Sequence, residues 1–450
     1  MNTLERKGII LLGDLAIILS ALGVYINDAL DVKVESMGYK ILFFSLGALL
    51  YLFLAYVLDF YNLERSLRTR ATLSQSFYVV GSFCLIVYFF SVLFFDSSHW
   101  RIPLIIFLCL PTVAIFLWRH FFNNLFKVIP TTRNVLYVYA GNGKDNSIEK
   151  YIDLIDGEEI NTFYKTKLTY SLEDVKFLEK GKFLEAINKI DSIILNLPGY
   201  DQIPLEFEKI LLNAILNGKE VIPFTAFYQN TYEALPIRSH NDSFYEILQL
   251  RQKKIRYIER VFSFCINIIL CLLVGPIFLV FIPFVAFFNL FFNKGPLFYT
   301  QKRVGLHGKE FNIYKFRSMV VDAEKGGAKM ASKNDSRITP FGRILRLFRI
   351  DELPQIISVI NGDMQFIGPR PERKVFVDTL KKNTPFYDAR HLIKPGITGW
   401  AQVKYKYGEN LEDSIRKLEY DLYYIKNKSV TLDLRILFKT ITTVLFSRGV

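Results

Sequence analysis

The chain has 450 residues, of which 51% are hydrophobic and 15% aromatic, and its formal net charge is +13. This length allows two or three folded units. The positive charge favours an anionic partner: lipid headgroups, a phosphate-bearing substrate or nucleic acid. The apolar residues are gathered into blocks, which argues against an ordinary soluble protein.

Four apolar blocks lie in the first 125 residues: Gly8–Ile26, Ile41–Leu58, Phe77–Phe95 and Ile102–Trp118. Each is close to the ~20 residues that a helix needs to cross the hydrocarbon core of a bilayer. Asp14 is the only charged residue inside them. Buried helices of a large soluble core are the alternative interpretation. We predict a four-span transmembrane region over 1–125, which makes nucleic acid an unsuitable partner.

Basic residues predict how these spans are oriented. Arg6 and Lys7 precede the first block, a basic cluster (Arg65, Arg68, Arg70) follows the second, and another (Arg119, Lys127, Arg133) follows the fourth. Acidic residues dominate the loop after the first block. Because positive charge collects on the cytosolic side, we expect the N-terminus and everything after Arg119 to be cytosolic.

Residues 134–240 alternate between strand-like and helical patterns. We predict strands at Asn134–Ala140, Ser192–Leu197 and Glu220–Phe224, and a helix at Leu205–Leu216. This alternation is typical of a small parallel α/β domain. The turn Gly141-Asn-Gly143-Lys144 suggests a phosphate loop, but the third glycine of the dinucleotide fingerprint is missing. We interpret 134–240 as a degenerate Rossmann-like domain.

The segment Val261–Phe292 contains 32 residues without a charge. A straight helix of that length would measure ~48 Å, against ~30 Å of hydrocarbon. Gly275-Pro276 lies near its middle and Pro283 a little beyond, and proline kinks a helix. Basic residues flank both ends, and the stretch before it, Arg251–Arg260, is typical of a headgroup anchor. We therefore predict a re-entrant helix that returns to the same face, with a fifth span as the alternative.

Two later segments have the pattern of helices that lie in the headgroup plane. Thr339–Ile350 has apolar residues at helical spacing and arginines on another side, and Leu434–Phe446 has Arg435 and Lys439 as its only charges. Basic amphipathic helices can lie at a membrane surface. Core-facing helices of a cytosolic domain are the alternative, above all for the second segment.

Two adjacent carboxylates, Asp351 and Glu352, follow the first of these segments at once. Asp351 suits the N-cap of a helix that runs to about Ile360 and ends at Gly362, so capping alone is one explanation. Neighbouring residues on a helix do not share a face, so the two carboxylates should have different roles. A carboxylate can attack phosphorus as a nucleophile, provided that cations screen the approach of two anions.

The surrounding sequence supplies those cations. Mg²⁺ favours carboxylate and phosphate oxygens, and Asp351 and Glu352 are its candidate ligands. Arginines and lysines that could hold a phosphate lie on both sides of the pair. A stiff Gly368-Pro-Arg-Pro371 turn would present one arginine with little freedom, which suits bidentate phosphate recognition. The candidate substrate-binding cations are Lys302, Arg303, Lys315, Arg317, Arg337 and Arg370.

Together these motifs resemble the bacterial polyprenyl-phosphate sugar-phosphate transferases, or phosphoglycosyltransferases, over roughly 250–450. The matching runs are Gln301-Lys-Arg-Val-Gly305, Tyr314-Lys-Phe-Arg-Ser-Met319, Thr339-Pro-Phe-Gly342, Asp351-Glu-Leu-Pro-Gln355, Asn361-Gly-Asp-Met364, Gly368-Pro-Arg-Pro-Glu372 and Lys394-Pro-Gly-Ile-Thr-Gly-Trp400. The upstream spans and Rossmann-like domain resemble the long members, which prime exopolysaccharide, capsule or O-antigen synthesis.

The resemblance implies a role for individual residues. Asp351 matches the nucleophile and Glu352 its magnesium-associated partner. Lys315, Arg370 and Asp421 match further site residues, which we expect to bind the substrate. Pro276 and Pro283 both remain candidates for the family's re-entrant proline. The implied architecture is a four-span α-helical membrane segment (1–125), a Rossmann-like α/β domain (134–240) and a mostly α-helical catalytic domain with a re-entrant membrane helix (250–450).

The resemblance also implies the reaction. Asp351 would attack the β-phosphate of a UDP-sugar, release UMP and hold the sugar-1-phosphate until polyprenyl (undecaprenyl) phosphate in the bacterial inner membrane accepts it. Two other classes stay open: a glycosyltransferase that releases a nucleoside diphosphate, and a non-enzymatic scaffold for polysaccharide assembly. The sugar, the lipid length and the oligomeric state, a homo-oligomer included, are left undetermined.

Overall fold

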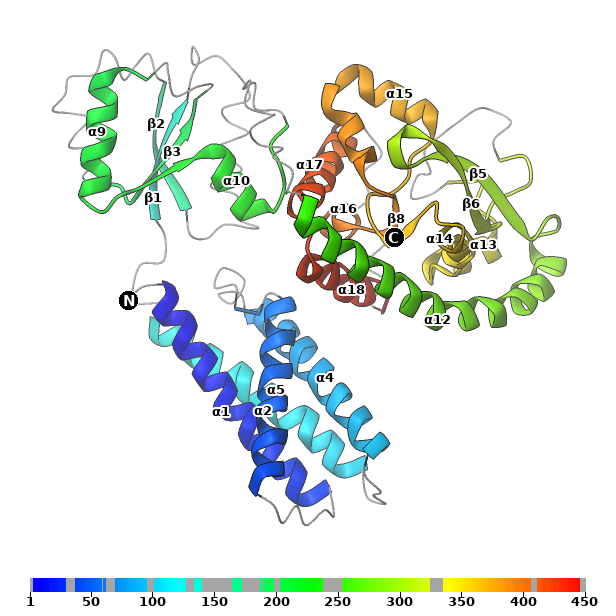
Figure 1. The fold of residues 1–450 in the computed structure, drawn as a ribbon, viewed down its shortest axis with the longest axis horizontal. Coiled ribbons are helices and arrows are strands. Elements are labelled where there is room, and N and C mark those ends of the chain that lie inside the picture. The colour runs from blue at the N-terminus through cyan, green and yellow to red at the C-terminus, as the bar shows by residue number, and fades with distance from the viewer. Residues whose placement is uncertain are drawn as a thin grey trace. The chain divides into compact units, whose positions relative to one another are not determined.

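A computed structural model covers residues 1–450 (Figure 1). The described residues are 3–29, 37–58, 60–61, 69–94, 101–126, 133–139, 164–171, 187, 189–197, 203–237, 253–323, 335–405 and 411–445. By their contacts the residues form two compact units: Met1–Leu195 with Pro204–Val221, and Asn196–Ile203 with Ile222–Val450. Helices dominate both.

Each apolar block of the first unit forms a helix: α1 (Thr3–Ala29), α2 (Met37–Val57), α4 (Thr69–Phe94) and α5 (Arg101–Phe126). Among the described helices, three are long and apolar enough to cross a membrane, at Lys7–Ile26, Thr72–Ser91 and Glu259–Phe292. Ile41–Val57 and Ile106–Phe122 are shorter apolar helices. These helices are those of a membrane protein, while the number of spans stays a prediction.

The one charge inside the first apolar blocks has a buried partner. Asp14 of α1 lies 2.5 Å from Arg119 of α5, and the two side chains are 0% and 2% exposed. Arg119 also donates to the carbonyl of Phe60 at 2.8 Å. A buried charge is costly unless paired, so this ion pair makes both charges tolerable and joins α1 to α5. Arg119 is therefore part of the helix packing as well as of the basic flank.

A four-stranded sheet in the order β2-β1-β3-β4 follows the helices. Its strands are β1 (Arg133–Tyr139), β2 (Tyr164–Ser171), β3 (Ser192–Asn196) and β4 (Glu220–Pro223), and β1 and β2 are parallel. The predicted helix is confirmed as α9 (Leu205–Leu216). The predicted strands coincide with β1, β3 and β4, and β2 was not predicted. The Gly141–Lys144 turn lies outside the described residues.

The uncharged segment forms α12 (Lys253–Phe292), a single helix that contains both Pro276 and Pro283. Figure 1 shows it as a curved helix with α13 (Pro340–Leu347), α14 (Ile356–Ile360) and the hairpin of β5 (Phe298–Val304) and β6 (Glu310–Phe316) on its concave side. The predicted break is thus a bend within a continuous helix. Most of its side chains in Glu259–Phe292 are not buried inside the protein, as expected of a helix whose apolar surface faces lipid.

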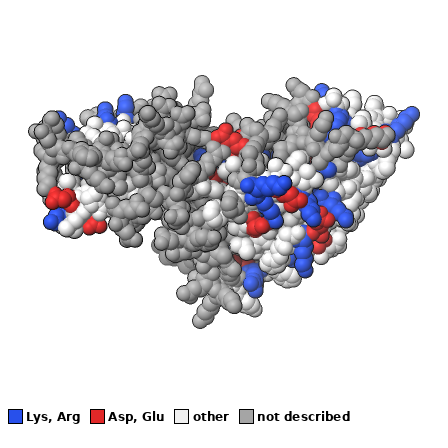
Figure 2. All heavy atoms as spheres, turned by 90° about the horizontal axis from the view of Figure 1, so that it is seen from above, with Lys and Arg blue, Asp and Glu red and all other residues white. Residues whose placement is uncertain are grey.

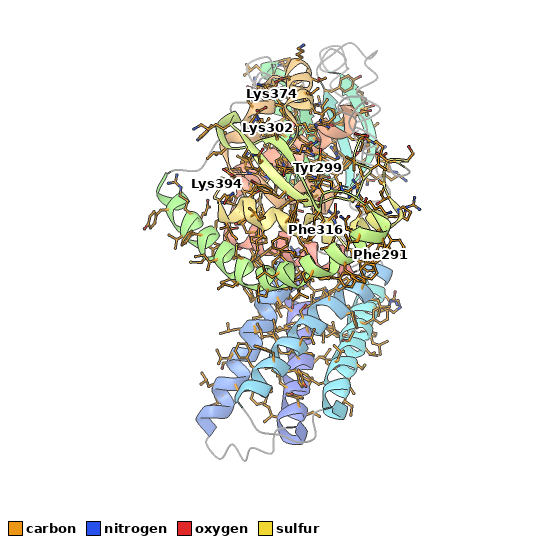
Figure 3. All side chains as sticks on the ribbon, turned by 90° about the vertical axis from the view of Figure 1, so that its right-hand side faces the viewer. Phe291, Tyr299, Lys302, Phe316, Lys374 and Lys394 are labelled. Carbon is orange, nitrogen blue, oxygen red and sulfur yellow. The ribbon has the colours of Figure 1, made fainter. Side chains whose placement is uncertain are left out.

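The hairpin β5 (Phe298–Val304) and β6 (Glu310–Phe316) is antiparallel. The Phe316 ring packs against Phe298 at 5.4 Å and against Phe278 of α12 at 5.9 Å, between centroids. Figure 3 labels Phe316 here, with Tyr299 and Lys302 farther along β5. The remaining elements are η3 (Ile350–Gln355), β7 (Gln365–Ile367), α15 (Lys374–Asn383), η4 (Pro385–Leu392), β8 (Gly396–Thr398), α16 (Trp400–Lys404), α17 (Leu411–Asn427) and α18 (Val430–Leu445).

Residues 224–237 pack as part of the second unit, although we predicted them in the Rossmann-like domain. They comprise α10 (Phe224–Tyr232) and the chain that follows it. Leu235 is fully buried in a core with residues of β5, α15, η4 and α17. The backbone carbonyl of Glu233 accepts a hydrogen bond from the Trp400 indole at 2.9 Å, and its carboxylate pairs with Lys404 and Arg435.

Candidate active site

The adjacent carboxylates lie at the start of η3, where the backbone turns sharply. Arg349, directly before η3, has φ +53, and Asp351 and Glu352 occupy the first turn. The chain continues into α14 and ends its helical course near Gly362, which has φ +81. The predicted helix to Ile360 is therefore present, but its first turn is a 3-10 helix and Arg349 holds the N-cap position predicted for Asp351.

Three cations converge on Glu352. Lys315 donates to its Oε1 at 2.9 Å, Arg370 donates to the same oxygen at 2.6 Å, and Arg349 donates to Oε2 at 3.3 Å. The carboxylate side chain is only 10% exposed. Burial alone would raise the pKa of Glu352, but these three cations outweigh burial and hold the pKa well below its usual range. Glu352 therefore stays ionised at neutral pH. Through Lys315, Arg349 and Arg370 it connects β6, the start of η3 and the turn after β7.

Asp351 has a different environment, although it is equally buried. It is 7% exposed, and no residue that the structure describes donates a hydrogen bond to its carboxylate. Burial raises its pKa from 3.8 to about 6, while Lys315 opposes the shift and the charge of Glu352 adds to it. At neutral pH Asp351 is thus an ionised carboxylate with free oxygens, next to cations. A nucleophile or a metal ligand needs these properties.

The Pro-Arg-Pro turn is held by its backbone. Four consecutive carbonyls, those of Pro369, Arg370, Pro371 and Glu372, each accept a hydrogen bond from outside the turn. The donors are the amide of Gly396 (2.9 Å), the guanidinium of Arg390 (2.9 Å), the guanidinium of Arg303 (3.2 Å) and the amide of Val304 (2.9 Å), respectively. A fixed backbone leaves the Arg370 side chain as the movable part, and that side chain ends at Glu352.

This turn depends on close backbone contact between β7 and β8. A Cβ on Gly368 would lie 2.6 Å from the carbonyl oxygen of Lys394, and one on Gly396 would lie 2.1 Å from the amide of Gly368. Real Cβ atoms do not approach backbone so closely, so both positions require glycine. The glycines of the Gly-Pro-Arg-Pro and Lys-Pro-Gly motifs therefore serve the same contact.

The other predicted cations lie in different surroundings. Arg303 holds the turn through Pro371 and also contacts Glu372 at 3.5 Å. Lys302, its neighbour on β5, is exposed. Arg337 pairs with Asp335 at 2.5 Å and donates to the carbonyl of Ala323. Figure 2 shows basic and acidic residues interspersed on the described part of one face.

Arg317 directly follows β6, and its side chain packs against the C-terminal end of α12. Each of its three guanidinium nitrogens donates to α12 or to the chain next to it, including the carbonyl of Pro296 at 2.7 Å and the side chain of Asn293 at 3.2 Å. Asn293 in turn donates to the carbonyl of Arg317 at 2.7 Å. Arg317 thus satisfies carbonyls at the C-terminus of α12 and ties β6 to it.

Asp421, which the resemblance implied, is 2% exposed and pairs with Arg390 at 2.9 Å. Three arginines of the site were not predicted from the sequence. Arg349 directly precedes the carboxylates, Arg346 lies close enough to Asp351 to lower its pKa, and Arg390 holds the turn. The sequence did place Arg346 and Arg349 on the polar side of the Thr339–Ile350 helix, but it gave no indication of a role for Arg390.

The carboxylates fit a magnesium ion that is shared with a substrate. Among the described residues no group of three or more His, Cys, Asp or Glu side chains is placed to hold a metal. Mg²⁺ commonly uses only one or two carboxylates together with substrate phosphates. Asp351 has free oxygens, and the three donors to Glu352 leave about one of its four lone-pair positions open.

Comparison with known proteins shows the family to which the chain belongs. Residues 254–447 match the family described as bacterial sugar transferase. The sugar transferase EpsL of Bacillus subtilis is 43% identical over 155 residues, which are 34% of this chain and 73% of that protein. The chain belongs to the bacterial sugar transferase family.

Longer relatives match as well. The UDP-N-acetylgalactosamine-undecaprenyl-phosphate N-acetylgalactosaminephosphotransferase of Aeromonas hydrophila is 49% identical over 157 residues, 35% of this chain and 37% of that protein. The UDP-glucose:undecaprenyl-phosphate glucose-1-phosphate transferase of Klebsiella pneumoniae is 32% identical over 298 residues, 63% of this chain and 62% of that protein. The chain thus spans less than two thirds of the length of either of these two relatives.

Proposed function

We propose that this protein transfers a sugar-1-phosphate from a UDP-sugar to undecaprenyl phosphate and releases UMP, as the priming step of exopolysaccharide, capsule or O-antigen synthesis. The observation that carries the proposal is the contrast between the two carboxylates: Glu352 is bound by three cations, whereas Asp351 is ionised at neutral pH and unbonded. The activities named for the two longer relatives agree with it.

In the proposed first step an Asp351 oxygen attacks the β-phosphorus of the UDP-sugar. The bond from that phosphorus to the bridging oxygen breaks, and UMP leaves with the electron pair. The sugar phosphate is then held on Asp351 as an acyl phosphate. In the second step an oxygen of undecaprenyl phosphate attacks the same phosphorus, the acyl phosphate bond breaks, and the Asp351 carboxylate is regenerated.

The cations around Glu352 support this chemistry. Arg370, Lys315 and Arg349 already lie within 3.3 Å of a carboxylate oxygen. An incoming diphosphate would meet the same positive field, which favours charge that develops on the phosphate oxygens. A bound Mg²⁺, held by Asp351 and Glu352 with the diphosphate, would screen the two anions. We expect EDTA to abolish UMP release and added Mg²⁺ to restore it.

The architecture we propose around this site follows the sequence. Helices α1, α2, α4 and α5 form four spans, and the sheet with α9 forms a degenerate Rossmann-like domain. Helix α12 enters the inner membrane and returns to the cytosolic face, so that Asp351 faces a lipid phosphate at the headgroup level. A reporter fused after Val450 should then report the cytosol, and a periplasmic signal would rule out the re-entrant arrangement.

The reaction is tested with the full-length protein in lipid nanodiscs that contain undecaprenyl phosphate. UDP-glucose, UDP-galactose and UDP-N-acetylgalactosamine are offered separately, and the nucleotide product is identified. UMP supports the proposal, UDP supports a glycosyltransferase, and no nucleotide product supports a scaffold. Without lipid, one UMP per protein and a sugar-phosphate adduct on the Asp351 peptide should form. Release of UMP only with lipid, without any adduct, would support direct attack by the lipid phosphate.

A further inference from the structure

Arg390, in η4, joins three parts of the second unit, although it lies away from Asp351 and Glu352 in the sequence. Its side chain is 8% exposed. One nitrogen donates to the carbonyl of Arg370 and to Asp421 Oδ2, each at 2.9 Å, and another donates to the hydroxyl of Tyr387. Both terminal nitrogens of its guanidinium are thus bonded to protein partners, and three of its five N–H donors are used on them.

Asp421 supplies the charge that Arg390 needs. It lies on α17 with its side chain 3% exposed, and Arg390 is the partner of its carboxylate. A buried guanidinium is stable only with a partner of opposite charge. Asp421 therefore fixes where the Arg390 fork points, and the fork fixes the Arg370 carbonyl.

The next contact reaches the active site. The Arg370 backbone is fixed at its carbonyl, and its guanidinium lies 2.6 Å from Glu352 Oε1. A displacement of the turn by a fraction of an ångström would lengthen this charge-assisted hydrogen bond. The contacts thus run from α17 through η4 and the turn to the carboxylate next to Asp351.

We propose that Asp421 and Arg390 are positioning residues, which hold the Pro-Arg-Pro turn so that Arg370 stays at Glu352 and do not themselves touch the substrate. This inference rests on the proposed function. It assigns Asp421 an indirect role, in place of the substrate contact that the resemblance implied.

A double-mutant cycle tests the proposal in the full-length protein, with UMP release as the readout. Arg370→Ala should lower kcat by about 100-fold or more, and Asp421→Asn by about 10- to 100-fold. The double variant should be no slower than Arg370→Ala alone, because no Arg370 side chain remains to be positioned. Losses that multiply, or an Asp421→Asn variant that raises KM for the UDP-sugar with kcat unchanged, would overturn the proposal.

A matched control separates positioning from general destabilisation of α17. Glu419 lies two residues before Asp421, is 4% exposed and pairs with Arg416 at 2.7 Å and with the Tyr228 hydroxyl at 2.7 Å. Glu419→Gln should lower the Tm much as Asp421→Asn does, yet keep kcat near wild type. An equal kcat loss in Glu419→Gln would assign the Asp421 effect to folding. If Asp421→Asn does not fold, Arg390→Lys, which keeps the charge and loses the fork, takes its place in the cycle.

A second readout does not depend on turnover. Phenylglyoxal labels accessible arginines, and Arg370, with a side chain 34% exposed and bonded to Glu352, is partly protected. Asp421→Asn should raise labelling of the Arg370 peptide several-fold, measured by mass spectrometry, and Glu419→Gln should not. If the wild type releases no UMP from any UDP-sugar, the proposed function fails while this labelling still tests the positioning. Unchanged labelling in Asp421→Asn would overturn it.

Discussion

Replacing Asp351 with asparagine should stabilise the folded protein while it removes the proposed nucleophile. Burial raises the Asp351 pKa from 3.8 to about 6, and each pKa unit corresponds to about 1.4 kcal/mol. Above pH 6 the ionised Asp351 therefore destabilises the fold by about 3 kcal/mol. The neutral amide of Asp351→Asn does not carry this penalty, so the substitution should raise the free energy of unfolding.

The change in stability should depend on pH, and this dependence identifies the Asp351 charge as its cause. Because the folded-state pKa is raised, the destabilisation is complete above about pH 6 and disappears below about pH 4, where Asp351 is protonated in both states. Thermal unfolding in nanodiscs should give Asp351→Asn a higher Tm than wild type at pH 8. At about 2–4 °C per kcal/mol, the gain should be several degrees, and the two proteins should converge near pH 4.

Glu352→Gln should have the opposite effect. The pKa of Glu352 lies well below its usual range, so its contribution to stability is present above about pH 4.5 and is lost only as the pH falls through that lowered value. Removing its charge leaves three cations uncompensated, at a cost on the order of 3 kcal/mol.

Asp378→Asn, which changes an exposed aspartate on α15 outside the family motifs, is the control and should leave both Tm and UMP release unchanged. A lower Tm for Asp351→Asn at pH 8, or a gain independent of pH, would refute the electrostatic reasoning.

Three further predictions concern the protonation of Asp351 and the contacts of Arg317 and Glu233. UMP release should decline below about pH 6, where Asp351 gains its proton, and a pH profile of kcat/KM without this limb would contradict that assignment. Arg317→Lys should lower the Tm by loosening the end of α12, with KM for the UDP-sugar unchanged; a raised KM with unchanged Tm would instead indicate substrate contact. Glu233→Gln should destabilise the second unit by on the order of 1–3 kcal/mol, since it leaves Lys404 and Arg435 without their anion, and an unchanged Tm would contradict this.

The sequence by itself predicted much of the fold. The four N-terminal helices, α9, α12 and the strands β1, β3 and β4 all lie where composition and periodicity placed them. These patterns are local: an apolar block or a 3.6-residue period records which face of an element avoids water. Local turn geometry was predicted less well, because the short 3-10 turn at Asp351 is imposed by its neighbours in space.

At the site, the sequence identified Asp351, Glu352, Lys315 and Arg370 as candidates, because rare groups of charge in fixed motifs mark chemistry. It did not distinguish a cation that meets Glu352 from one that caps a helix, as Arg317 does. Lys315, which meets Glu352, and Arg317 are both cations that flank Phe316 in the same motif.

Only the tertiary structure decided those roles. Glu352 and Lys315 are 37 residues apart and Arg390 and Asp421 are 31 apart, yet both pairs are in contact. The pKa values of Asp351 and Glu352 move in opposite directions although the residues are adjacent. Burial and the number of cations within hydrogen-bond reach set those directions, and both depend on how distant segments pack around the pair.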